Sequence, residues 1–479
     1  MICDHDTIAA PATAAGGALA VIRLSGGDAL TICDRIFRGS APLADAEGYT
    51  VHYGHIIMAD GRTLDDVLVT VFRAPRSYTG EDAAEISCHG SQYIVSETLR
   101  LLTAAGARMA QPGEFTIRAY LAGKLDLSQA EAVADIIASS SQASHALAAN
   151  QMRGGYSEAF DTLREKLLHL TSLLELELDF SEEEVEFADR TQLRDTMRQI
   201  KERIDALRSS FSLGNAIKEG VAVAIVGAPN VGKSTLLNRL LNEERAMVSD
   251  IAGTTRDVIE ERANIDGVVF RFLDTAGIRS TNDTLEQMGI ARTMSSIERA
   301  QLIIHLIDAS QSAVPASGAN PASGQTIRKS DSAVQSANPV TDIHRLPTDF
   351  PLRSDQTLLT VYNKIDKTPG LALPEGAVGI SARSGDGIDD LRQALRNAVD
   401  TEALYHGGTV ISNSRHYEAL TAASDSLNLA LDGLRDNLPT DLLSEDIRQV
   451  IRHLSGVTGQ DIVPEEVLKT IFSKFCIGK

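Results

Sequence analysis

The chain has 479 residues, 43% of them apolar, and its 45 basic and 65 acidic side chains leave a net charge of −20. This length exceeds what one hydrophobic core usually holds and predicts about three domains. The acidic balance argues against a protein that grips nucleic acid unaided, because binding phosphates requires a basic surface.

Membrane and secreted classes are also disfavoured. No run approaches the roughly 20 apolar residues of a membrane-spanning helix, and the N-terminus lacks the basic start of a secretory signal. The cysteines are scattered without a CxxC pair, which argues against a zinc site or a disulfide framework and predicts a cytoplasmic protein. They are Cys3, Cys33, Cys88 and Cys476.

Residues 1–122 combine short strand-like runs, such as 18–24 and 66–72, with a helical pattern at 96–105. Turns separate these runs, and the mixture predicts a compact α+β domain.

Residues 123–216 and 404–479 carry helical periodicity. Phe160, Leu163 and Leu167 follow one another at three- and four-residue spacing with charges between them. Glycine and proline are sparse in the first of these stretches, so long packed helices are predicted in both.

Residues 217–403 alternate strand-like and helical runs. The strand-like runs are 221–226, 268–273, 302–307 and 358–361. This alternation predicts a doubly wound α/β domain with a largely parallel sheet, inserted into one discontinuous helical domain. The expected fold class is therefore multidomain, α/β together with α+β.

The segment from about 310 to 352 is rich in Ser, Ala, Pro, Gln and Asn and shows no periodicity. A structureless loop of that length is unusual inside a compact domain. We predict a disordered excursion from the inserted domain, most simply an insertion without a function of its own.

Residues 227–234 read GAPNVGKS, which matches the GxxxxGK[ST] pattern of a P-loop. The loop follows the apolar run VAVAIV and opens the helical run STLLNRLL, the context that this motif requires. Its backbone N–H groups and the helix N-terminus favour phosphate oxygens. Lys233 is expected to bridge the β- and γ-phosphates, and Ser234 to ligate Mg²⁺.

Four further motifs follow in the order expected of a GTPase. They are GTTRD at 253–257, DTAG at 274–277, NKID at 363–366 and SAR at 381–383. Asp274 can hold Mg²⁺ through water, and Asp366 can accept both guanine N–H donors. Together the five motifs predict a Ras-like domain of the translation-factor type. The predicted GTP-binding residues are Asn230, Val231, Gly232, Lys233, Ser234, Thr235, Ser249, Asp250, Ile251, Ala252, Gly253, Thr254, Thr255, Asp274, Thr275, Ala276, Gly277, Asn363, Lys364, Asp366, Ser381, Ala382 and Arg383.

The residue after DTAG departs from the Ras pattern. Ras-type enzymes carry a water-orienting Gln there, whereas this chain has Ile278. From the residues alone, Arg279, Asp283 and Glu286 are all candidates for the missing catalytic role. Asn230 inside the P-loop can help to hold a monovalent cation, which can act in place of an arginine finger.

Beyond these shared motifs, the chain resembles the MnmE (TrmE) family of tRNA modification GTPases. The resemblance rests on SYTGED at 77–82, PGEFTIRAYLAGKLDLSQAEAVADII at 112–137, DFSEEEVEFADR at 179–190 and FCIGK at 475–479. It covers essentially the whole chain apart from the 310–352 segment. It implies an N-terminal folate-binding and dimerisation domain, a discontinuous helical domain and an inserted G domain.

The family resemblance implies a function and partners. The implied activity is potassium-stimulated GTP hydrolysis in a homodimer. The implied partner is MnmG, an FAD protein, in a heterotetramer or a larger complex. Together they would add a carboxymethylaminomethyl or aminomethyl group to C5 of the wobble uridine of certain tRNAs, using 5-formyl- or 5,10-methylene-tetrahydrofolate. The acidic chain is expected to meet tRNA mainly through this partner, and no membrane is implied.

The resemblance also assigns residues. Glu286 matches the catalytic glutamate and is therefore preferred over Arg279 and Asp283. The potassium ligands would be Asn230, Ser249, Ile251 and Thr254, the Mg²⁺ ligands Ser234 and Thr255, and the folate contacts Arg23, Glu81, Lys124 and Lys479. Arg and Lys suit folate carboxylates, and a carboxylate suits pterin N–H donors.

Two alternatives stay open. Cys476 is either a thiolate nucleophile in the modification or a small residue that packs the tail. The whole chain is either a tRNA modification enzyme or, on its G domain alone, a GTP-gated ribosome-assembly or RNA-binding switch. Folate binding and association with MnmG distinguish these two functions.

Overall fold

The computed structural model describes residues 6–14, 16–179, 190–244, 260–273, 294–311, 352–353, 356–399, 409–459, 468, 471–472, 475 and 478. The chain forms two compact units. The first comprises Met1–Ala138, Ala148–Arg208 and Arg415–Lys479, and the second comprises Ser139–Leu147 and Ser209–Ser414. The predicted domain boundaries at residues 122, 216 and 403 stay predictions.

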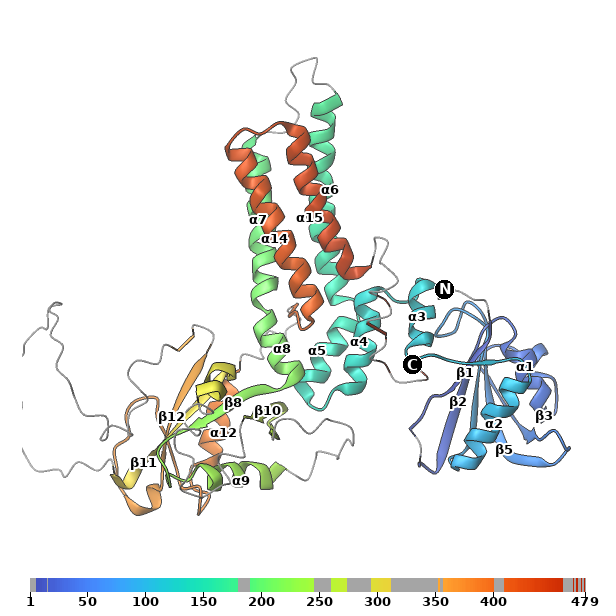
Figure 1. The fold of residues 1–479 in the computed structure, drawn as a ribbon, viewed down its shortest axis with the longest axis horizontal. Helices are drawn as coiled ribbons and strands as arrows, with labels where there is room; N and C mark the ends of the chain where they lie inside the picture. Colours follow the sequence, from blue (N-terminus) through green and yellow to red (C-terminus); the bar gives the residue numbers. More distant parts are fainter. Residues whose placement is uncertain are drawn as a thin grey trace, which may run out of the picture. The chain divides into compact units, whose positions relative to one another are not determined.

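The first unit contains a seven-stranded sheet with the strand order β3-β4-β5-β6-β2-β1-β7 (Figure 1). Its neighbouring strands run antiparallel, except that β1 and β7 are parallel. The strands are β1 (Ile8–Pro11), β2 (Leu19–Ser25), β3 (Phe37–Gly39), β4 (Thr50–Ile57), β5 (Thr63–Phe72), β6 (Ala83–His89) and β7 (Arg108–Met109).

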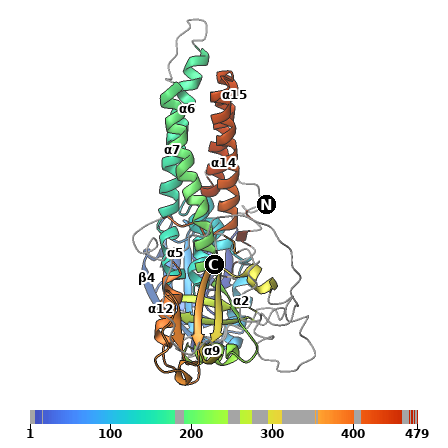
Figure 2. The same ribbon diagram turned by 90° about the vertical axis from the view of Figure 1, so that its left-hand side faces the viewer.

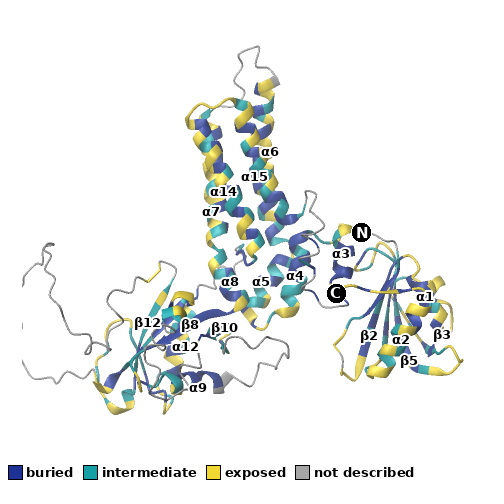
Figure 3. Cartoon of the chain, in the orientation of Figure 1, coloured by how far each residue is buried: buried dark blue, intermediate teal, exposed yellow. Residues whose placement is uncertain are grey.

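One face of this sheet is covered and the other is open. Along β5, Val67, Val69 and Val71 are buried in a core shared with α1 (Ala29–Ile36) and α2 (Gln92–Ala104), while Leu68 is exposed. Figure 3 marks buried and exposed residues along α2. Leu68 pairs directly with Tyr53 of β4, which is 61% exposed. The open face therefore carries apolar side chains that this unit does not cover. A short 3₁₀ helix, η1 (Leu43–Asp45), follows β3.

Most of the other described residues of the first unit are in helices. Figures 1 and 2 show α6, α7, α14 and α15 side by side as long rods. The apolar periodicity explains this packing, because Phe160, Leu163 and Leu167 of α6 are all buried. The predicted long helices are thus confirmed. The helices are α3 (Glu114–Leu121), α4 (Leu127–Ala138), α6 (Gly155–Asp179), α7 (Arg190–Ser209), α14 (Ser414–Arg435) and α15 (Thr440–Thr458). Helix α5 (Gln142–Met152) has residues in both units.

A buried polar cluster joins three of these helices. Glu131 of α4 is 6% exposed and accepts hydrogen bonds from Arg415 Nε at 2.8 Å and Arg415 Nη2 at 3.0 Å. His416 Nε2 lies 2.8 Å from the same carboxylate. Arg415 also donates to the carbonyl oxygens of Gly456 and Val457 at the end of α15. One arginine thus connects α14 with both α4 and α15.

The second unit is built on a six-stranded sheet with the order β13-β12-β11-β8-β10-β9. Only β9 is antiparallel to its neighbour, β10, and the other pairs are parallel. The predicted strand at 221–226 is confirmed with those bounds, whereas β9 was not predicted. The strands are β8 (Val221–Val226), β9 (Glu261–Ile265), β10 (Val268–Phe272), β11 (Leu302–Asp308), β12 (Thr357–Asn363) and β13 (Val378–Ile380).

Alternate residues of β8 enter two different cores. Val221, Val223 and Ile225 face one core, and Ala222 and Ala224 face the other. Both faces of the strand are therefore buried, as expected for a parallel sheet between helical layers. The predicted α/β fold class is confirmed. The helical segments are α8 (Phe211–Glu219), α9 (Lys233–Glu244), α12 (Ile388–Asn397), η3 (Ala309–Gln311) and η4 (Ile365–Lys367).

The two ends of the second unit are bonded together. The N–H of Ile411 donates to Ser210 Oγ at 3.0 Å. A Cβ atom on Gly214 would lie 2.1 Å from the carbonyl oxygen of Ile411, so only glycine permits this approach. Entry and exit of the chain thus lie side by side, as an inserted domain requires. Within the described residues, none of the helices has both the length and the apolar character needed to cross a bilayer.

Candidate functional site

The P-loop runs between the end of β8 and the start of α9, at the carboxyl edge of the parallel sheet. Gly227 and Gly232 have φ values of +153° and +106°, and Asn230 is left-handed at +61°. A Cβ atom on Gly227 would lie 2.3 Å from the carbonyl oxygen of Leu306. These positive φ values and close contacts explain why the loop carries glycine at both positions.

Lys233 curls back over this loop. Its Nζ donates to the carbonyl oxygens of Gly227 at 2.8 Å and Ala228 at 3.0 Å. Burial lowers the pKa of the Lys233 ammonium. Ser234 follows in the first turn of α9 and is half-buried, and Thr235 is exposed. The ammonium thus lies on the phosphate-binding loop that it was predicted to serve.

Asn363 at the end of β12 holds three loops together. Its Nδ2 donates to the carbonyl oxygen of Val231 at 2.7 Å, and its Oδ1 accepts from the N–H groups of Lys364 at 2.8 Å and Ala382 at 3.0 Å. The side chain is 2% exposed. The structure therefore brings together the P-loop, the NKID motif and the SAR motif, although Asn363 and Val231 lie 132 positions apart in the sequence.

Asp308 also contacts one of these loops, and the sequence did not predict it. We call Asn363, Lys364, Asp308 and the loops that they join the cluster around Asn363. Its Oδ2 accepts from Lys364 Nζ at 2.6 Å, and the same ammonium donates to the carbonyl oxygen of Asn230 at 2.9 Å. Burial opposes ionisation of Asp308, but hydrogen bonds from Lys364 and Ser310 keep its pKa below the ordinary value. Its position at the carboxyl end of β11, next to β12, is the feature from which a role in this site could have been predicted.

The two predicted base-reading segments lie next to this cluster. Asp366 is exposed within η4, so its carboxylate is accessible. Ser381 and Ala382 are buried, and Arg383 is exposed. Arg239 of α9 donates to the carbonyl oxygen of Arg383 at 2.6 Å and thereby ties the SAR loop to the helix that begins at the P-loop. Buried backbone and an exposed carboxylate at one sheet edge suit recognition of a planar base.

Several predicted residues lie outside the described part of the chain. The switch residues 249–255, the DTAG motif at 274–277, the three catalytic candidates Arg279, Asp283 and Glu286, and most of the 310–352 segment belong to this group. So do Cys476 and Lys479. Their predicted roles stay predictions.

A second candidate site lies in the first unit, around a cavity of about 150 Å³. Arg23 projects from β2 between two aromatic rings, 5.6 Å from the centroid of Tyr78 and 5.7 Å from that of Phe115. Its Nε donates to Glu85 Oε1 at 2.9 Å. The cavity is lined by Arg23, Ser25, Phe72, Tyr78, Thr79, Ala83, Glu85 and Phe115.

Two more of the predicted folate residues lie beside this cavity. Glu81 accepts a hydrogen bond at 2.7 Å from Ser25, one of the lining residues. The side chain of Lys124 lies next to Gly80, which adjoins the lining residue Thr79. A Cβ atom built on Gly80 would lie 3.4 Å from Lys124 Cε. Arg23 Nη1 also donates to the carbonyl oxygen of Gly478 at 3.3 Å, so the C-terminal tail reaches the same place.

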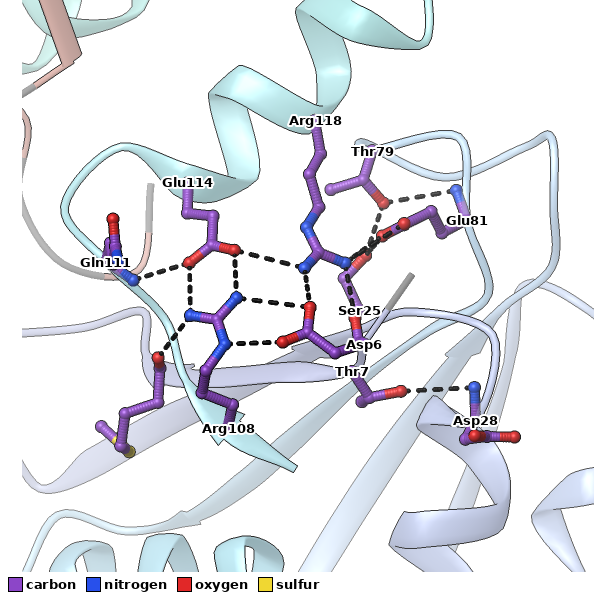
Figure 4. A network of polar contacts seen from close by, with 11 residues as sticks. Asp6, Thr7, Ser25, Asp28, Thr79, Glu81, Arg108, Gln111, Glu114 and Arg118 are labelled. Carbon is purple, nitrogen blue, oxygen red and sulfur yellow. Dashed lines mark hydrogen bonds and ion pairs between the residues drawn. The ribbon is translucent and has the colours of Figure 1, made fainter. Parts of the chain in front are cut away.

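Sequence reasoning missed the network that surrounds Glu81 (Figure 4). It consists of Asp6, Ser25, Thr79, Arg108, Glu114 and Arg118. Glu114 and Arg118 belong to the run at 112–137 that carries the family resemblance, but the sequence of a helix does not show which partner a charged side chain meets.

Comparison with known proteins agrees with this architecture. A sequence profile described as the MnmE helical domain matches residues 127–476, and one described as the GTP-binding protein TrmE N-terminus matches residues 7–124. A protein of Cytophaga hutchinsonii called tRNA modification GTPase MnmE is 48% identical over 485 residues, covering 100% of this chain and 99% of the relative. A protein of Bacteroides fragilis with the same name is 47% identical over 492 residues, covering 99% and 100%.

Among solved structures, the G domain of FeoB from Methanococcus jannaschii is 23% identical and covers 37% of this chain and 96% of that chain. The TM-score is 0.23.

Proposed function

The chain belongs to the MnmE family of tRNA modification GTPases, and from this membership we propose its chemistry in detail. It hydrolyses GTP and, with the FAD-containing protein MnmG, adds a carboxymethylaminomethyl or aminomethyl group to C5 of the wobble uridine of certain tRNAs. The observation that carries this proposal is the identity of 46–48% with relatives of that name over essentially the full chain.

The cluster around Asn363 supports the proposed GTP site. Lys233 and the P-loop amides would hold the phosphates, and Asp366 would accept from the guanine N–H groups. Ser234 would ligate Mg²⁺ together with Thr255, and the ion would neutralise charge that develops on the phosphates. The half-buried Ser234 hydroxyl, next to Lys233, suits such an ion because hard cations prefer oxygen ligands.

For hydrolysis we propose a cation-assisted mechanism. Ile278 cannot orient water, so Glu286 would position or polarise the attacking water instead. A potassium ion held by Asn230, Ser249, Ile251 and Thr254 would stabilise negative charge in the transition state. The left-handed backbone of Asn230, at φ +61°, supports a specialised role for this P-loop position.

We propose that the cavity beside Arg23 binds a reduced folate. Its aromatic walls suit the flat rings of that cofactor, Glu81 would accept from the pterin N–H donors, and Arg23 with Lys124 and Lys479 would contact carboxylates. Bound as 5-formyl- or 5,10-methylene-tetrahydrofolate, the cofactor supplies a one-carbon unit. The bond between Arg23 and the carbonyl oxygen of Gly478, two residues beyond Cys476, supports a contact of this segment with the folate site.

For assembly we propose a homodimer formed by the N-terminal sheets. Val51 and Tyr53 of β4 and Leu68 of β5 are 59%, 61% and 46% exposed, and such apolar side chains suit a protein interface. With a net charge of −20, the chain would leave most tRNA contacts to its partner.

The deciding experiment compares GTP hydrolysis in potassium and sodium for the wild type and Glu286→Ala. We expect potassium to accelerate the wild type strongly and the variant not at all, while both bind a fluorescent GTP analogue. Equal turnover in both salts, unchanged by the substitution, would favour a partner-activated switch. A second assay measures modified wobble uridine made with MnmG, and unmodified tRNA there would refute the tRNA chemistry separately.

A further inference from the structure

The carboxylate of Glu81 is held on one side by a closed ring of hydrogen bonds (Figure 4). The Glu81 N–H donates to Thr79 Oγ1 at 3.3 Å, the two hydroxyls of Thr79 and Ser25 lie 2.6 Å apart, and Ser25 Oγ donates to Glu81 Oε2 at 2.7 Å. Because Ser25 gives its only hydroxyl hydrogen to Glu81, the hydrogen in the contact between the two hydroxyls comes from Thr79. The ring therefore runs in one direction and fixes the rotamer of Glu81.

On its other side the same carboxylate meets Arg118 of α3. Arg118 Nη1 lies 3.2 Å from both carboxylate oxygens of Glu81 and donates to the carbonyl oxygen of Asp6 at 2.8 Å. Arg118 Nη2 donates to Asp6 Oδ1 at 2.8 Å and Glu114 Oε1 at 3.2 Å. The side chain is 7% exposed. A buried guanidinium with its terminal N–H groups engaged in this way cannot swing aside, so it is a rigid support.

Glu81 nevertheless keeps acceptor capacity. A carboxylate offers about four lone-pair sites, and the contacts to Ser25 and Arg118 occupy at most three of them. The side chain is 29% exposed, and its supports Ser25 and Thr79 line the 150 Å³ cavity. The free part of the carboxylate is thus available to a ligand in or beside that cavity.

We propose that Arg118 is a positioning residue for the folate site, which orients Glu81 toward the pterin without touching the ligand. This inference rests on the proposed folate binding. Its physical basis is preorganisation: a carboxylate locked in its binding rotamer loses little conformational freedom when the ligand arrives.

Arg108 supplies a matched control from the same network. It donates to Asp6 Oδ2 at 2.6 Å and to Glu114 Oε1 at 2.6 Å, so it shares two acceptors with Arg118. Its described contacts do not include Glu81. Removal of either arginine disturbs the ion-pair network, but of the two only Arg118 contacts the Glu81 carboxylate directly.

The test is a double-mutant cycle on the full chain, with 5-formyltetrahydrofolate titrated calorimetrically into the wild type, Arg118→Ala, Glu81→Gln and the double variant. We expect each single variant to lose roughly ten-fold or more in affinity, as for a lost charge-assisted contact. The double variant should bind no more than about two-fold more weakly than Glu81→Gln alone, because Arg118 acts through Glu81. Arg108→Ala should keep wild-type affinity within about two-fold although its melting temperature falls.

Two results would overturn the proposal. One is a double-variant loss equal to the product of the single losses, and the other is an equal loss in Arg108→Ala, which would make the effect purely structural. If Arg118→Ala fails to fold, Arg118→Lys takes its place, since it keeps the charge and loses the planar fork. A wild type that binds no 5-formyltetrahydrofolate would refute the folate site itself, and the positioning role with it.

Discussion

Lys364 Nζ lies 2.6 Å from Asp308 Oδ2, so the NKID loop is fastened to the end of the neighbouring strand. The same ammonium bonds the carbonyl oxygen of Asn230 in the P-loop. The lysine backbone is left-handed, with φ +68°, a conformation that costs free energy for any residue other than glycine. The Lys364 ammonium thus links the NKID loop, the end of β11 and the P-loop.

We expect Asp308→Asn to weaken GTP binding by roughly ten-fold, because an amide in place of the carboxylate gives Lys364 a much weaker partner. Titration with a fluorescent GTP analogue measures the change. Asp389→Asn is the control, since that carboxylate is 98% exposed and lies 3.9 Å from Arg392. Equal affinity of Asp308→Asn and the wild type would refute a positioning role for Asp308.

Gly232→Ala should abolish GTP binding and lower the melting temperature of the second unit. A Cβ atom there would lie 2.2 Å from Asn363 Nδ2, and the backbone φ of +106° is unfavourable for alanine. Gly370→Ala separates the backbone strain from the clash, because Gly370 has a φ of +85° but open space around its Cβ position. We expect Gly370→Ala to cost about 1 kcal/mol of stability and to keep nucleotide binding. A Gly232→Ala variant that binds GTP normally would show that the clash relaxes.

Arg415→Ala should destabilise the helical part of the first unit by about 3 kcal/mol. It takes the guanidinium partner away from the carboxylate of Glu131, which is 6% exposed, and removes bonds to the end of α15. Arg452→Ala is the matched control, since Arg452 pairs with Glu445 at side-chain exposures of 54% and 50%, and such pairs contribute about 0–1 kcal/mol. Urea unfolding followed by circular dichroism compares the two variants, and equal losses would contradict the prediction.

We expect the contribution of Glu131 to folding stability to be lost in acid. Burial alone would raise the pKa of Glu131, but the neighbouring His416 and Arg415 lower it from 4.5 to about 2. A depressed carboxyl pKa stabilises the folded state above the unfolded value, and this contribution is lost as the pH falls from about 4.5 to about 2.

Melting temperatures of the wild type and Glu131→Gln across this window measure the effect. We expect the wild-type curve to fall more steeply, because the glutamine cannot take up a proton. The exposed-carboxylate variant Glu445→Gln should follow the wild-type curve. Parallel curves for Glu131→Gln and the wild type would show that this carboxyl does not couple to folding.

Local patterns predicted much of the fold. The apolar run VAVAIV forms β8 with its predicted bounds, and the run at 302–307 forms β11, one residue longer. The helix predicted at 96–105 begins four residues earlier, at Gln92, and ends at Ala104 in α2. Periodicity reports which face of an element is buried, so it finds elements better than their ends.

In the two candidate sites, the sequence predicted the residues of known motifs but not the ion pairs between distant segments. Val231 and Asn363 were predicted to share a site because motifs carry their chemistry with them, and the structure joins them by a 2.7 Å bond. Asp6 and Arg118 lie 112 positions apart and form a half-buried ion pair that no local sequence pattern indicates. Pairing of charges across a fold depends on tertiary packing, which a single sequence does not display.

The bond between Ser210 and Ile411 bears on the order of folding. These residues are 201 positions apart, yet their bond brings the flanks of the second unit together. The entropy lost in closing a flexible loop grows with its length, so α7 and α14 would meet slowly across an unfolded segment of that size. Once the inner unit has folded, its two ends lie together, and the loop that α7 and α14 must close is effectively short. Refolding of the helical bundle should therefore wait for the unit inserted within it, and a slow inner unit would set the pace for the whole chain.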